Sequence, residues 1–94
     1  RIPLASPLTA QIGGMSPAMA RVRTISLGGA YLESERRLAV GDSFKVEIRS
    51  GFRRIHTTAV VRNSGPEGGG VEFVQMKEDD REKLRRLVQR HLTE

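Results

Sequence analysis

The stretch Thr24-Ile25-Ser26-Leu27-Gly28-Gly29-Ala30-Tyr31-Leu32 combines a strand, a break and the start of a second strand. Its first four residues alternate hydroxyl and apolar side chains, which predicts an extended strand with the hydroxyls on one face. The paired glycines end that strand, because glycine tolerates positive φ angles and a close approach of other backbone. The pattern therefore predicts either a tight turn with surface hydroxyls or a polar surface beside bare backbone that could seat a ligand.

Alternating patterns on both sides of this stretch predict further strands. The clearest covers residues 43–49, where Phe44, Val46 and Ile48 alternate with charged side chains. Strands are also predicted at residues 8–12, 20–26, 30–33, 53–63 and 71–74. The segment 63–70 is rich in glycine and contains Pro66, so it is predicted to be a loop.

Helical periodicity appears only near the end of the chain. One apolar stripe is formed by Leu84, Leu87, Val88 and Leu92. Asp79 and Glu82 have the spacing of a capping box, which predicts a helix over residues 79–92 that packs on the sheet. Many short strands followed by one helix, without βαβ alternation, predict an all-β barrel or sandwich covered by a helix.

The composition limits the possible partners. Ninety-four residues with 37% hydrophobic side chains suit one domain with a modest core. Sixteen basic and eleven acidic residues leave a formal charge of +5, which suits nucleic acid, a membrane surface or a nucleotide, or serves solubility alone. One Tyr, three Phe and no Trp provide few platforms for base stacking, which argues against nucleic acid.

The sequence also argues against several other classes of protein. It has no cysteine, so disulfides and thiolate metal sites are excluded. No apolar run is long enough to span a membrane, and no signal peptide is visible. His56 and His91 have no nucleophile or acid beside them in sequence, so we expect neither an enzyme nor a metal site. The chain begins at Arg1 rather than Met, which predicts a fragment or a processed chain.

The segment from Thr24 to Gly29 resembles the (Asp/Asn)-x-Ser-x-x-Gly motif of PilZ domains, the bacterial receptors for cyclic di-GMP. Ser26 and Gly29 match the motif, and Thr24 stands where the family has Asp or Asn. Two other stretches resemble the family's fourth-strand entry and last hairpin: Val40-Gly41-Asp42 and Gly70-Val71-Glu72-Phe73. The resemblance covers nearly the whole chain. It implies a six-stranded antiparallel split barrel with a C-terminal helix, divided into an N-terminal arm at 1–6, a barrel at 7–76 and a helix at 79–92.

The resemblance implies a cytoplasmic receptor or effector module for cyclic di-GMP, acting in bacterial control of motility and biofilm. In the family an Arg-x-x-x-Arg segment before the first strand clamps phosphate and guanine. Arg1 falls where the second of these arginines belongs, and the first would lie upstream of Arg1. Because Thr24 offers one hydroxyl instead of a carboxylate or amide, it cannot pair with the guanine edge through two hydrogen bonds.

Two further arginines are candidates for the ligand's phosphates. Arg21 and Arg23 lie on the face opposite Thr24 and Ser26 in a regular strand, and a bulge before Thr24 would bring the four together. The predicted ligand-binding residues are thus Arg1, Arg21, Arg23, Thr24, Ser26 and Gly29. The alternative is a PilZ-like interaction domain that contacts a protein partner or an adjoining domain and does not bind the nucleotide.

Overall fold

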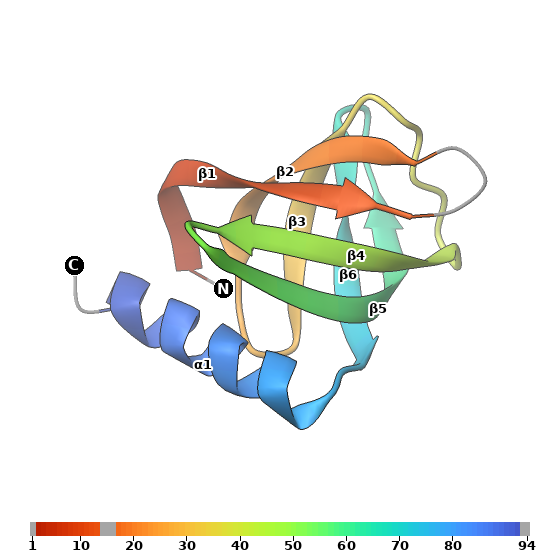
Figure 1. The fold of residues 1–94 in the computed structure, drawn as a ribbon. Helices are drawn as coiled ribbons and strands as arrows, with labels where there is room; N and C mark the ends of the chain where they lie inside the picture. The colour runs from red at the N-terminus through yellow and green to blue at the C-terminus, as the bar shows by residue number, and fades with distance from the viewer. Residues whose placement is uncertain (1, 14–16, 93–94) are drawn as a thin grey trace.

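Six antiparallel strands close into a barrel, and one helix packs on the outside of the barrel (Figure 1). The computed structural model describes residues 2–13 and 17–92. The elements are β1 (Ile2–Ile12), β2 (Ala18–Ile25), β3 (Gly29–Ser34), β4 (Ser43–Ser50), β5 (Arg53–Ser64), β6 (Gly68–Gln75) and α1 (Glu78–Leu92). The strands follow the order β1-β2-β3-β6-β5-β4, and β1 pairs with β4 to close the barrel. The predicted all-β, six-stranded antiparallel barrel with a C-terminal helix is confirmed.

Alternation along the strands builds the core. Phe44, Val46 and Ile48 of β4 are buried, as their spacing predicts. Each of the other strands also turns apolar side chains into the barrel, and Leu38 of the β3–β4 connection is buried with them. Because the strand period is two, each strand keeps one apolar face inside and one polar face in water.

The helix covers β5 and β1 through its apolar stripe. Leu84, Leu87 and Val88 are buried, while the side chain of Leu92 lies outside the described part of the chain. The outer positions of α1 carry charged residues. No helix in residues 2–13 and 17–92 is long and apolar enough to cross a membrane.

The predicted cap at Asp79 is wrong. The helix begins at Glu78, and the backbone N–H of Arg81 donates to the carbonyl of Lys77 at 2.9 Å, so Asp79 lies inside the first turn. The carboxylate of this turn that bonds to the barrel is Asp80, which is 6% exposed and accepts a hydrogen bond of 3.0 Å from the backbone N–H of His56. The bond satisfies a β5 donor just before the pairing of β5 with β6 begins at Thr58.

Two other boundaries differ from the sequence prediction. β1 begins at Ile2 rather than Leu8, so residues 2–6 belong to a strand instead of a separate arm, and Leu4 is buried in the core. A register shift between Pro3 and Leu8 interrupts the alternation that would have marked the longer strand. The predicted loop at 63–70 is also too long, because β5 continues to Ser64 and β6 starts at Gly68.

Candidate functional site

A β-bulge in β2 decides which side chains face outward near the end of that strand. Val22 and Thr24 pair with consecutive residues of β3, so Arg23 is an extra residue on β2. The buried side chains accordingly fall at Val22 and Ile25, three residues apart instead of two. Because of the bulge, Arg23 and Thr24 lie on the same outer side of the barrel. From the sequence, a bulge before Thr24 is required if the arginines of β2 are to lie on the same side as Thr24. The structure has this bulge.

The turn between β2 and β3 is organised by the hydroxyl of Ser26. Its Oγ accepts hydrogen bonds from the backbone N–H groups of Gly28 at 3.3 Å and Gly29 at 3.1 Å. The same hydroxyl donates to the Gly29 carbonyl at 3.2 Å, and the Ser26 N–H donates to that carbonyl at 2.8 Å. One donor and two acceptor positions are therefore used inside the turn, which is the full capacity of a hydroxyl.

The glycines of this turn do not use the conformational freedom that the sequence suggested. The glycines with positive φ in the described residues are Gly41 and Gly51, and neither Gly28 nor Gly29 is among them. The Gly28 carbonyl accepts a hydrogen bond of 2.9 Å from the backbone N–H of Phe73 in β6. The paired glycines thus have no positive φ, and the serine side chain together with β6 holds the turn.

Thr24 has an unsatisfied hydroxyl. Its Oγ1 is buried and has no hydrogen-bond partner among the described residues. Leaving a buried polar group without a partner costs stability, so such an atom calls for an explanation. Thr24 pairs with Pro3 at the start of β1, and Ile2 pairs with Ile25. The first residues of the described chain therefore lie beside this hydroxyl.

Arg21 and Arg23 line a depression of about 790 Å³ over β1, β2 and the end of β3. Three carboxylates line the same depression: Glu33, Glu35 and Glu67. Arg23 Nε lies 2.5 Å from Glu33 Oε2, and this hydrogen bond raises the pKa of Arg23 above its usual value. Arg21 forms no ion pair with any described residue. Of the two guanidiniums, Arg21 is the one available to an anion.

The predicted site residues thus occupy two adjoining places. Arg21 and Arg23 line the depression, whereas Thr24, Ser26 and Gly29 form the end of β2 and its turn. The bulge joins the two places on one side of the barrel. Arg1 lies outside the described residues.

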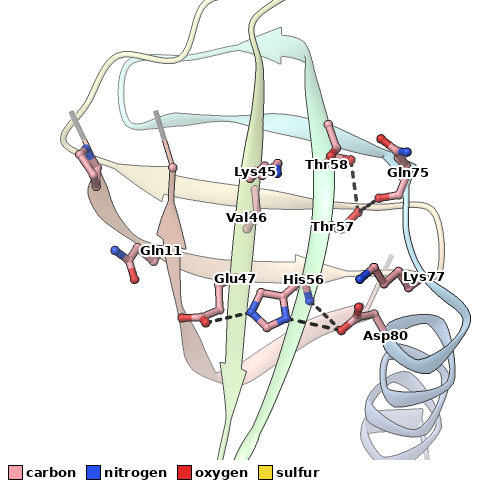
Figure 2. Close-up of a pocket in the computed structure, with 12 residues that line it drawn as sticks. Gln11, Lys45, Val46, Glu47, His56, Thr57, Thr58, Gln75, Lys77 and Asp80 are labelled. Atoms are coloured by element: carbon pink, nitrogen blue, oxygen red, sulfur yellow. Dashed lines mark hydrogen bonds and ion pairs between the residues drawn. The ribbon is translucent and has the colours of Figure 1, made fainter. Parts of the chain in front are cut away.

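A second depression, of about 550 Å³, was not anticipated from the sequence. It lies over β4 and β5 beside the start of α1, and Figure 2 shows His56 between Glu47 and Asp80. His56 Nε2 is 3.0 Å from Glu47 Oε1, and His56 Nδ1 is 3.7 Å from Asp80 Oδ1. Hydrogen bonds from Arg49 and His56 lower the pKa of Glu47. Glu47 and His56 face each other across the β4–β5 hairpin, whereas Asp80 comes from α1, so local spacing carries no signal for the whole cluster.

The His56 cluster links three elements of the fold. Asp80 and Glu47 fasten the start of α1 and the middle of β4 to the same β5 residue. The neighbouring hydroxyl of Thr57 donates to the Gln75 carbonyl at 2.9 Å, so it is engaged with β6. Within residues 2–13 and 17–92, no group of three or more His, Asp or Glu side chains could hold a metal ion.

Comparison with known proteins places this fold in a family. The family model of the PilZ domain matches residues 1–90. The chain is a PilZ domain. This PilZ domain is similar to the solved structure of the Bacillus subtilis inhibitor of motility, MotI/DgrA, with a TM-score of 0.78 and 24% sequence identity. The alignment covers 99% of this chain and 51% of that one, so the PilZ domain spans about half the length of the MotI/DgrA chain. No match was found among curated proteins.

Proposed function

We propose that this PilZ domain is a receptor module for cyclic di-GMP, with the ligand bound against the outer side of β2 and the β2–β3 turn. The observation that carries the proposal is the bulge at Arg23, which places arginine and Thr24 side chains on one side of the barrel. Arginine provides a planar fork for phosphate and a flat face for stacking on guanine. The module binds and signals, and it needs neither catalysis nor a cofactor.

The pairing of β1 with β2 supports a clamp from the N-terminal side. Ile2 lies opposite Ile25, so the chain enters the barrel beside the residues that precede the Ser26 turn. An arginine-bearing segment before β1 therefore reaches the same side as Arg21 and Arg23. Binding of the dianionic ligand would order that segment, and the change would be passed to a protein partner or an adjoining domain.

Isothermal titration calorimetry with cyclic di-GMP tests the proposal. Arg21→Ala should weaken binding by about tenfold or more, because a hydrogen bond to a charged group contributes roughly 1.5–3 kcal/mol. Arg62→Ala is the matched control, since Arg62 is an exposed arginine on β5 that pairs with Glu72. Equal losses in both variants would show a non-specific charge effect and contradict the proposed site.

Two substitutions should improve binding. Thr24→Asn restores the side chain found in the family motif and offers two polar groups to a guanine edge, so we expect a gain of about tenfold. Glu33→Gln removes the carboxylate that holds Arg23, and it should raise affinity and steepen its salt dependence. A version extended upstream of Arg1 with a second arginine at the clamp spacing should bind more tightly again. No response to any of these changes would place the ligand elsewhere.

The second candidate is an interaction domain that does not bind the nucleotide. Two observations favour it. Arg23 already forms an ion pair with Glu33, and the Ser26 hydroxyl uses all of its hydrogen bonds within its own turn. The absence of binding heat, with both the chain itself and the extended version, would establish this reading and reject the first. Cyclic di-AMP serves as the control for recognition of guanine.

A further inference from the structure

The β4–β5 hairpin and the adjoining face of α1 form a surface with concentrated positive charge. Ser50 and Arg53 of the hairpin lie around one shallow hollow with Lys83, Arg86 and Arg90 of the helix. Lys83 Nζ also donates to the Arg54 carbonyl at 3.3 Å, which ties the helix to β5. We call this the hairpin–helix surface. Figure 1 shows the hairpin turning back above α1.

Most of the chain's excess charge gathers on this surface. Six cations belong to it: Arg49, Arg53, Arg54, Lys83, Arg86 and Arg90. Arg90 has a further interaction and is left out of the balance. The other five cations face two paired carboxylates, Glu47 and Glu82, which leaves an excess of three in a chain whose formal charge is +5. Arg49 and Arg54 even lie directly opposite each other across the two strands. Like charges in that position lower stability, so this arrangement fits an anionic partner better than a structural role.

An aromatic side chain stands at the tip of the same hairpin. Phe52 is 107% exposed, so its own domain leaves the side chain uncovered. The other large exposed apolar side chains are 47–64% exposed and are partly covered by the barrel. Gly51 turns the chain with φ at 61°, which holds Phe52 beyond the ends of β4 and β5. A fully exposed aromatic ring flanked by arginines is typical of surfaces that bind at a membrane interface, where an apolar layer adjoins a charged one.

We propose that the hairpin–helix surface docks on a membrane whose lipids carry anionic headgroups, with Phe52 inserted at the level of the headgroups. Cations near an anionic bilayer attract its headgroups, and an aromatic ring gains by leaving water for the interface. The hollow between hairpin and helix measures only about 10 Å³, which is too small to receive a partner's side chain. A soft bilayer can accommodate a projecting ring without a complementary pocket.

This docking leaves the β2 side of the barrel accessible. In the closed strand order, β2 and β5 are three strands apart in either direction, as are β3 and β4. The outer faces of β2 and β3 therefore point away from those of β4 and β5. The proposal does not depend on nucleotide binding, and its test contains no nucleotide.

Sedimentation with lipid vesicles tests the docking directly. We expect binding to vesicles of equal parts phosphatidylglycerol and phosphatidylcholine, lost at high salt and absent on phosphatidylcholine alone. Phe52→Ala should weaken binding at least about tenfold, and Arg53→Ala and Lys83→Ala about fivefold each. Arg37→Ala is the matched control, because Arg37 is an exposed cation in the β3–β4 connection, at the far end of β4. An equal loss for Arg37→Ala would overturn the proposal.

A fluorescence measurement distinguishes insertion from mere attraction. The chain has no Trp, so Phe52→Trp creates a single reporter. We expect its emission to shift to shorter wavelength with the anionic vesicles, while Val40→Trp, at an exposed position in the β3–β4 connection, shows no shift. Absence of a shift at Phe52→Trp would overturn the insertion. Binding of polyglutamate or duplex DNA that depends on Arg53 and Lys83, without vesicle binding, would assign the surface to that partner and reject the membrane.

Discussion

The β2–β3 and β5–β6 hairpins are both rich in glycine, yet the surroundings of their glycines differ: open space in the first and close backbone in the second. In the β2–β3 turn, a Cβ added to Gly28 would meet nothing within 4 Å, and the backbone needs no positive φ there. In the β5–β6 hairpin, a Cβ on Gly68 would lie 1.8 Å from the Leu32 carbonyl oxygen, and one on Gly69 would lie 2.5 Å from the Asn63 carbonyl oxygen. The β2–β3 turn is held by the hydroxyl of Ser26, whereas the β5–β6 hairpin depends on the absence of side chains at Gly68 and Gly69.

The difference shows why glycine has two readings in a sequence. At a turn, glycine supplies conformations that other residues avoid. Within a strand, it permits another backbone to come closer than a Cβ would allow. Gly68, Gly69 and Gly70 are all buried strand residues between β3 and β5, so here the second reading applies. Substitutions in the two hairpins should separate the two roles.

Gly68→Ala should have the largest effect. The added methyl would overlap backbone atoms of β3, which cannot rotate away as a side chain can. We expect a loss of at least about 3 kcal/mol in the free energy of unfolding, measured by urea denaturation. A loss below about 0.5 kcal/mol would show that β6 does not pass β3 as closely as described.

Gly70→Ala should cost less, about 1–2 kcal/mol, because the obstacle is a side chain. The new Cβ would lie 2.9 Å from both terminal atoms of Asn63, whose Oδ1 accepts a hydrogen bond from the Gly70 N–H. In a background of Asn63→Ala the same substitution should cost less than it does alone, since the obstacle is gone. Strictly additive losses in this double-mutant cycle would contradict the contact.

Ser26→Ala should cost about 1 kcal/mol, because the turn loses the hydrogen bonds of the hydroxyl while its backbone bond to Gly29 remains. Hydrogen exchange of the Gly28 and Gly29 amides should accelerate, whereas exchange in β5 should not change. If the amides keep their protection, the hydroxyl does not organise the turn.

Gly28→Ala should have the smallest effect, a change within about 0.5 kcal/mol of zero, because the native position tolerates a Cβ and alanine restricts the unfolded chain. Gly41→Ala is its control: that glycine also has open space around it, but its φ is 93°. The control should lose about 1 kcal/mol or more in thermal or urea unfolding. Equal losses in the two variants would mean that Gly28 is needed for its conformation after all.

Much of the fold could be predicted from periodicity. The alternation of Phe44, Val46 and Ile48 and the helical spacing of Leu84, Leu87 and Val88 identify elements whose buried faces are present as predicted. Such patterns are visible because burial acts on each element separately along its own period. The same reasoning missed the start of β1 and the strand character of Gly68–Gly70, where a register shift or a close neighbour breaks the local pattern.

The candidate site could be predicted only in part. The sequence pointed to the residues of β2 and to the need for a bulge, and the bulge lies at Arg23. It carried no sign that Glu33 would pair with Arg23 or that the hydroxyl of Ser26 would be used within its turn. These pairings depend on which groups the register of β2 with β3 and the closing of the turn bring together.

The sequence by itself determined the alternating strands, the single terminal helix and the excess of positive charge, because each follows from the order and type of neighbouring residues. Only the tertiary structure decided that Asp80 binds the β5 backbone, that glycines in β6 make room for β3, and that the cations of α1 lie beside the β4–β5 hairpin. Each of these joins residues that are far apart in the chain. Their proximity follows from closing the barrel, which no local pattern encodes.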